Sequence, residues 1–85
     1  EDLPMIQEKG KGQFEVDALI RIEDFNEFFD TQYLDEDFDT LGGMIINKLG
    51  KFPQKGESLS MNPLTFKVLR SDSRRLQLIE VREIE

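Results

Sequence analysis

The stretch DTLGGMIINKLGKFPQKGE, from Asp39 to Glu57, decides the fold because it specifies both ends of one helix. Thr40 is a favourable N-cap residue. The apolar residues that follow it at helical spacing are Leu41, Met44, Ile45 and Leu49. Gly50 suits the left-handed conformation that often follows a helix, and Pro53 cannot continue one. We therefore predict a helix over residues 41–49, followed by a turn.

Two glycines, Gly42 and Gly43, stand in the first turn of this predicted helix. Each weakens a helix by up to about 1 kcal/mol relative to Ala, so their presence indicates that another segment passes close by. A phosphate cradle is the alternative, because free N–H groups at a helix N-terminus attract anions. The spacing fits neither the Walker loop nor the dinucleotide fingerprint, and an acidic run already occupies this helix end. Close packing is the favoured interpretation.

The segment before this stretch predicts a hairpin and a short helix. From Met5 to Ile20 two strands are expected around the turn KGKG, and the inward side chains of the second are Phe14, Val16, Ala18 and Ile20. The period then becomes helical, and the apolar residues are Ile22, Phe25, Phe28 and Phe29. We expect these phenylalanines in the core, and any left outside would favour self-association.

The remaining segments predict a loop and three strands. Residues 31–39 lack a period, and Leu34 and Phe38 are expected to fix this loop to the core. The predicted strands are Ser58–Met61, Leu64–Arg70 and Leu76–Ile84, with SDSRR as a turn. The apolar residues of the last strand do not alternate strictly, which indicates a bulge or apolar cover on both faces.

Composition excludes several classes of function. The 85 residues suit one small domain, and 18 Asp and Glu against 11 Lys and Arg give a net charge of −7, which disfavours nucleic acid and anionic lipid. The chain has no Cys and no His, so it lacks thiolate ligands, imidazole ligands and the commonest general base. No residue pattern places a nucleophile beside a base. We therefore expect no enzyme activity and no membrane insertion by this segment.

The acidic run before the helix is the remaining candidate for a metal site. Asp35, Asp37 and Asp39 alternate as in a calcium loop, but Thr40 stands where such a loop needs Gly and Ile46 where it needs Glu. A solvated acidic loop is the favoured interpretation. A cation sensor built from Asp35, Glu36, Asp37 and Asp39 stays open as an alternative. We assign no catalytic, cofactor-binding or metal-binding residue and expect no cofactor.

From about Met5 to Ile84 the order and spacing of FEVDALIRIEDFNEFF, DFDTLGGMIINKLGKFPQKGE and FKVLRSDSRRLQLIEVR resemble the CorC/HlyC transporter-associated domain. The residues that carry the most specific part of the resemblance are Asp39, Thr40, Gly43, Leu49, Gly50, Lys51, Phe52, Pro53, Gly56 and Glu57. Two positions depart from the family pattern. Ala18 replaces a usual Gly, and Arg21 replaces a small or capping residue before the first helix, which predicts a poorly capped helix.

The resemblance implies an α+β fold in which two helices pack on one side of a small mixed or antiparallel sheet, as in the FAD-binding domain of the flavin oxidases. The resemblance also implies a place at the C-terminus of bacterial CBS-pair proteins that are described as hemolysin-like or as magnesium and cobalt efflux proteins. We expect residues 1–4 to be a linker remnant and residues 5–85 to be a single domain, a fragment of a longer protein. The expected location is cytoplasmic, with the parent protein attached to the inner membrane.

The same resemblance implies a non-enzymatic regulatory role that modulates ion transport. The expected partners are the CBS pair and the transmembrane domain of the same parent chain, or a second copy of the domain. Two alternatives stay open: a module that binds FAD or an adenine nucleotide, which would need an apolar pocket with a few polar groups, and a divalent cation sensor that uses the acidic loop.

Overall fold

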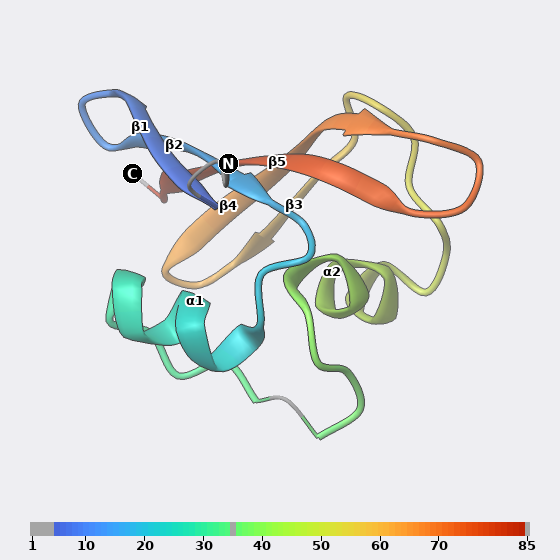
Figure 1. Ribbon diagram of the computed structural model, residues 1–85, viewed down its shortest axis with the longest axis horizontal. Coiled ribbons are helices and arrows are strands. Elements are labelled where there is room, and N and C mark those ends of the chain that lie inside the picture. Colours follow the sequence, from blue (N-terminus) through green and yellow to red (C-terminus); the bar gives the residue numbers. More distant parts are fainter. Residues whose placement is uncertain (1–4, 35, 85) are drawn as a thin grey trace.

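A five-stranded sheet with two helices on one side forms the domain in the computed structural model, which describes residues 5–34 and 36–84 (Figure 1). In chain order the elements are β1 (Ile6–Gly10), β2 (Gln13–Asp17), α1 (Ile22–Phe29), α2 (Leu41–Leu49), β3 (Ser58–Met61), β4 (Leu64–Ser71) and β5 (Leu76–Glu83). The strand order is β1-β2-β5-β4-β3, and every neighbouring pair is antiparallel. The predicted α+β fold is therefore confirmed. Its kinship with FAD-binding domains stays a prediction.

The core lies between the sheet and the two helices (Figure 1). Its buried side chains are Val16, Ala18, Ile20, Ile22, Phe25, Leu41, Met44, Ile45, Leu64, Phe66, Val68, Leu76, Ile79 and Val81. The central strands β2, β5 and β4 supply most of the sheet's share. Each large side chain contributes about 1.5–3 kcal/mol through burial, so a core this thin depends on nearly every member.

A bulge explains the irregular pattern of the last strand. Val68 pairs with Ile79, but the register shifts twice in the next residues and Ser71 pairs with Leu76. The shift lets Leu76 and Ile79 both point into the core although they are three residues apart. The predicted bulge is confirmed, and it involves both β4 and β5.

The segment Ala18–Ile22 crosses the first turn of α2 at very short range. A Cβ atom on Gly42 would lie 3.3 Å from both the Cβ and the carbonyl oxygen of Ala18, which is tighter than ordinary van der Waals contact. On Gly43 it would lie 3.2 Å from the Cβ of Phe38. The close approach predicted from the glycine pair is therefore confirmed. Ala18, the departure from the family pattern, fills the space that Gly42 leaves.

The same crossing uses up the amides at the start of α2. The donors and acceptors are Leu41 N to Ile20 O (2.9 Å), Gly42 N to Ala18 O (2.9 Å) and Gly43 N to Thr40 Oγ1 (3.2 Å). Thr40 is thus the N-cap, as predicted. Because each of these amides already has a protein acceptor, the first turn cannot serve as an anion cradle.

The second half of the opening stretch forms a turn in which each conspicuous residue has a structural role. Gly50 (φ 75°) and Gly56 (φ 94°) adopt the left-handed backbone that favours glycine, and Pro53 is fully buried. The Glu57 carboxylate accepts a hydrogen bond from Gln54 N (2.7 Å) and pairs with Lys51 Nζ (2.9 Å). The backbone hydrogen bond and then Lys51 lower the pKa of Glu57.

The loop between the helices is fixed to the core by Tyr33 and Phe38. Phe38 packs on the core as expected, whereas the expectation for Leu34 was wrong, because its side chain is 71% exposed. The neighbouring Tyr33 lies between Phe25 and Phe66 instead, and its hydroxyl donates to the Met61 carbonyl (2.7 Å). Adjacent side chains of an extended loop point in opposite directions, so only one of the two faces inward.

The start of α1 is as poorly capped as predicted. Arg21 makes no side-chain hydrogen bond to the helix. The Ile22 amide instead donates to the carbonyl of Asp39 (2.9 Å). The residues just before the two helices, Arg21 and Thr40, form an isolated antiparallel bridge, so the starts of α1 and α2 hold each other in place.

We predict that Gly43→Val lowers the free energy of unfolding by about 1–3 kcal/mol, because the branched side chain would push on Phe38 and on the capping hydroxyl of Thr40. The control is Asn47→Val at an exposed position of the same helix, which should change stability by less than about 0.5 kcal/mol. Thermal unfolding compares the two. An unchanged melting temperature for Gly43→Val would contradict the packing role.

We predict that Glu57→Gln makes the domain less sensitive to acid. The pKa of Glu57 is lower in the folded than in the unfolded chain, so its contribution is complete above the unfolded value of about 4.3 and is lost as the pH falls through the folded pKa. Melting temperatures from pH 6 to pH 3 should therefore fall less steeply for Glu57→Gln than for Glu36→Gln in the acidic loop. Equal slopes would contradict the assignment.

Candidate functional site

An open groove of about 650 Å³ lies beside α1, next to the tip of the β1–β2 hairpin and the end of β5. Its apolar walls include Phe14, Phe28, Phe29, Pro63 and Ile84. Charged residues of the lining are Glu8, Lys11, Arg82 and Glu83. A volume of this size suits part of a partner chain or a small ligand.

Three aromatic rings form the wall of the groove on the α1 side. The ring centroids of Phe14 and Phe29 are 5.1 Å apart at 87°, and those of Phe14 and Phe28 are 5.8 Å apart at 82°. Phe28 and Phe29 also meet edge to face, at 4.9 Å. Phe29 in turn stacks on buried Phe25 at 4.4 Å, so the wall is continuous with the core. The wall therefore extends the core to the surface.

The sequence-based placement of Phe28 was wrong. Phe25 is buried and Phe29 partly buried as expected, but the Phe28 side chain is 55% exposed. A helix turns by 100° per residue, so Phe28 lies at the margin of the stripe centred on Phe25 and Phe29, and it faces the groove rather than the sheet. An exposed phenylalanine between two aromatic neighbours is a typical anchor for a binding partner.

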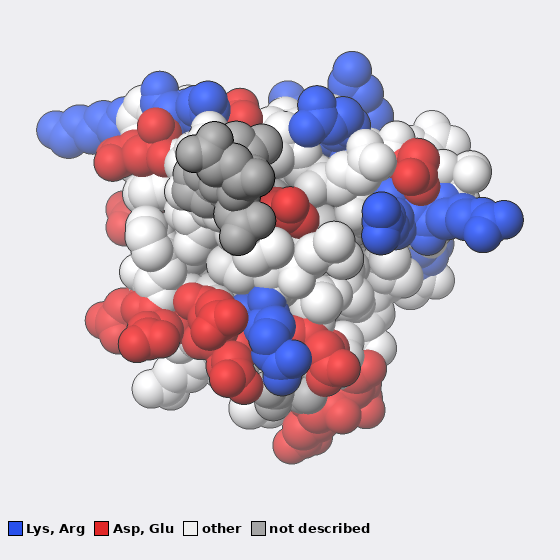
Figure 2. All heavy atoms as spheres, viewed as in Figure 1, with Lys and Arg blue, Asp and Glu red and all other residues white. Residues whose placement is uncertain are grey.

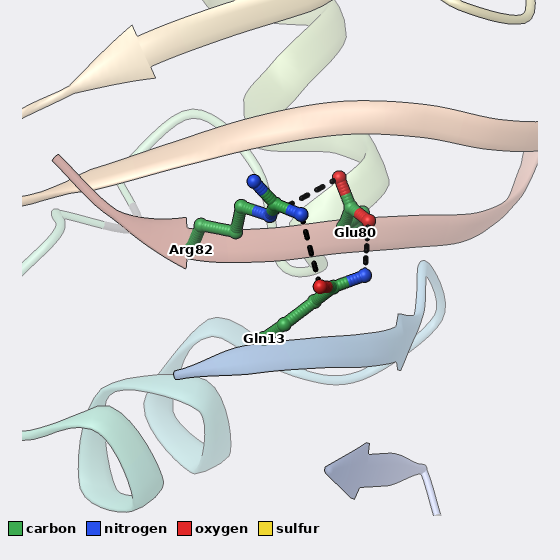
Figure 3. Close-up of polar contacts among 3 residues, drawn as sticks. All are labelled: Gln13, Glu80 and Arg82. Carbon is green, nitrogen blue, oxygen red and sulfur yellow. Dashed lines mark hydrogen bonds and ion pairs between the residues drawn. The ribbon is translucent and has the colours of Figure 1, made fainter. Parts of the chain in front are cut away.

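A polar cluster lies where β2 and β5 run side by side (Figure 3). Gln13 Nε2 donates to Glu80 Oε2 (2.7 Å), and Arg82 Nη2 donates to Gln13 Oε1 (2.9 Å). Arg82 Nε lies 3.7 Å from Glu80 Oε1. The three side chains are engaged with one another across the two strands, so the cluster is a cross-strand link. The sequence did not reveal it, because only the strand register brings Gln13 beside the other two.

The acidic loop lies at the surface in the part of the chain that the structure describes. Glu36, Asp37 and Asp39 are all exposed. Among residues 5–34 and 36–84, no three acidic side chains are placed to hold a metal ion. Asp35, the first member of the proposed set, lies outside the described residues.

Tyr33 has an ordinary structural role. Burial raises the pKa of its phenol, and the hydroxyl donates to a backbone carbonyl. The group therefore stays protonated at neutral pH and fixes the loop to the sheet.

Neither helix of the described chain is long and apolar enough to cross a membrane.

The model of the "Transporter associated domain" family, CorC_HlyC, matches residues 7–85. A magnesium and cobalt efflux protein CorC from Pasteurella multocida is 40% identical over 76 residues, which is 89% of this chain and 25% of that protein. The chain therefore spans about a quarter of the length of this relative.

Solved structures agree with these matches. A putative Mg2+ and Co2+ transporter (CorC) associated region from Neisseria meningitidis is 36% identical, with a TM-score of 0.93 over 95% of this chain and 100% of that one. A CorC_HlyC domain of a Xylella fastidiosa hemolysin, solved in complex with Mg++ and Mn++, is 21% identical, covers 96% of this chain and 100% of its own, and has a TM-score of 0.85. That second likeness concerns the fold alone.

We predict that Phe25 and Phe28, two aromatic residues of α1, contribute unequally to the stability of the fold. Phe25→Ala should lower the free energy of unfolding by about 3–5 kcal/mol, because it empties the core. Phe28→Ala should cost only about 1–2 kcal/mol, from its partial burial and its two aromatic contacts. Urea unfolding measures both. Equal losses would show that Phe28 is a core residue and not part of a binding surface.

Proposed function

The chain belongs to the CorC/HlyC family of transporter-associated domains, and from this membership we propose that it is a non-enzymatic regulatory domain of a magnesium and cobalt efflux protein. The observation that carries the proposal is the match over residues 7–85 together with 40% identity to a CorC efflux protein, of which the matched part is a quarter. A domain that makes up about a quarter of an efflux protein acts on the larger transport unit to which it is joined.

The chemistry of the described surface supports coupling through protein contacts. The chain contains no His and no Cys, and the polar cluster on β2 and β5 is engaged with itself. Among the residues that the structure describes, the groove beside α1 offers apolar walls and an exposed aromatic ring. We propose that the domain acts in the cytoplasm, contacts the CBS pair and the transmembrane part of its parent chain, and so modulates efflux at the inner membrane.

A domain exchange tests this proposal. In the Pasteurella multocida CorC protein, deletion of the matching segment should alter cobalt tolerance and cobalt efflux of a host that depends on the protein, and insertion of this chain in its place should restore both. The control is insertion of the Phe25→Ala form, which should fail because its core is disrupted. Unchanged efflux after the deletion would contradict a regulatory role.

One observation favours a second candidate, a small-ligand module. The groove combines aromatic walls with the basic side chains of Lys11 and Arg82, which suits the aromatic rings and phosphates of FAD or an adenine nucleotide. Amide NMR titration of the chain with FAD, ATP and Mg²⁺ separates the candidates. Saturable shifts confined to the groove would favour the ligand module, shifts at residues 36–39 the cation sensor, and no shifts the protein-contact proposal.

A further inference from the structure

The excess of negative charge in this chain comes from one continuous stretch of its sequence. Residues 22–39, which form α1 and the loop to α2, contain eight Asp and Glu and no Lys or Arg. The rest of the chain carries ten acidic and eleven basic residues, which nearly cancel. Figure 2 shows most of the acidic atoms over the helices at the bottom of the view, with a basic group among them, and most basic atoms along the sheet at the top and right. The net charge of −7 therefore belongs to the helical side.

The exposed wall of the groove lies within this acidic region. Asp24 precedes Phe28 by one helical turn on the same face, and Glu27 is its neighbour in sequence. Glu8 and Glu83 line the groove from the other side. Of the two basic residues there, Arg82 already pairs with Glu80 and Gln13. The lining itself carries two acidic and two basic residues, and the acids of α1 beside Phe28 make the surroundings of the groove acidic on that side.

We propose that this groove binds an amphipathic segment of a protein partner, with apolar side chains on one face and Lys or Arg on the other. The inference rests on the proposed function and names the surface and the partner chemistry of its protein contact. Apolar side chains of the partner cover Phe28, Phe14 and Ile84, and its basic side chains reach the acids of α1 and Glu8. The α1 helix, of eight residues, is about 12 Å long and matches about two turns of a docked helix.

Charge decides against the other occupants. A second copy bound through a twofold axis would bring two acidic α1 faces together, and such like-charge contact costs several kcal/mol. Nucleotide phosphates and anionic lipid headgroups could use Lys11, but Arg82 is engaged with Glu80 and Gln13, and Glu8, Glu83 and the acids of α1 repel them. A basic amphipathic segment is the class that gains from both the exposed aromatic ring and the acids beside it.

The test measures binding of a synthetic amphipathic helix of about 15 residues, with a Leu stripe and Lys and Arg on its polar face, to the 85-residue chain. The relative from Neisseria meningitidis was solved as a chain of the same extent, so the isolated domain is a suitable form. The matched probe has the same Leu stripe with Glu in place of the basic residues. Calorimetry and amide shifts should show saturable binding of the basic peptide at the groove and none of the acidic one.

Variants distinguish binding at the groove from attraction by the net charge of the domain. Phe28→Ser should weaken binding by about tenfold or more, while Leu34→Ser, at a still more exposed apolar residue in the acidic loop, should leave it unchanged. Asp24→Asn with Glu27→Gln should weaken binding more than Glu36→Gln with Asp37→Asn. Circular dichroism verifies that each variant is folded.

Three results would overturn the inference. The peptide would be attracted by net charge alone if both double charge variants weakened its binding equally and Phe28→Ser had no effect. A dimer in sedimentation equilibrium that Phe28→Ser dissolves would make a second copy the occupant. Binding of ATP or FAD in the groove that displaces the peptide would make it a ligand pocket. The proposed function is tested separately, by efflux after deletion of the domain. A negative result with the peptide would therefore overturn the inference about the groove and leave the proposed function standing.

Discussion

The rest of the structure depends on the backbone contact between Ala18–Ile22 and the first turn of α2. Two carbonyls of that segment accept hydrogen bonds from the amides of Leu41 and Gly42 at 2.9 Å, and a Cβ at position 42 would lie 3.3 Å from Ala18, tighter than ordinary contact. The contact ties the end of β2 to the start of α2, and the Arg21–Thr40 bridge extends it to the start of α1. One short crossing thus orients both helices on the sheet, which suits a chain too small to do so by burial alone.

This arrangement leaves the two helices unequal. Four of the nine residues of α2 are buried, whereas α1 buries only Ile22 and Phe25 among its eight. The contact at the glycine pair holds α2 against the sheet, and α1 therefore presents most of its side chains outward. An apolar ring such as Phe28 is tolerated there because Phe14 and Phe29 already support its edge, so exposure costs the fold little.

The sequence predicted those elements whose signals are local. Thr40 and Gly50 marked both ends of α2 because capping depends on residues within one turn, and the broken alternation around Leu76 indicated the bulge. The errors concern orientation within an element. Periodicity could not distinguish Phe28 from Phe29, because that choice depends on where the sheet ends. The loop has no period, so nothing in the sequence showed that Tyr33 rather than Leu34 takes the inward position.

The candidate site was out of reach of the sequence for a related reason. The groove joins Phe14 on β2, Phe28 on α1 and Ile84 after β5. The antiparallel pairing of β2 with β5 and the packing of α1 on the sheet together bring these distant segments side by side. The charge that surrounds the groove was visible in the sequence as an acidic run, but its meaning changes once the fold places it beside an exposed ring. Acids dispersed over a surface mainly keep a protein soluble, whereas acids that surround an apolar anchor select the charge of what can cover it.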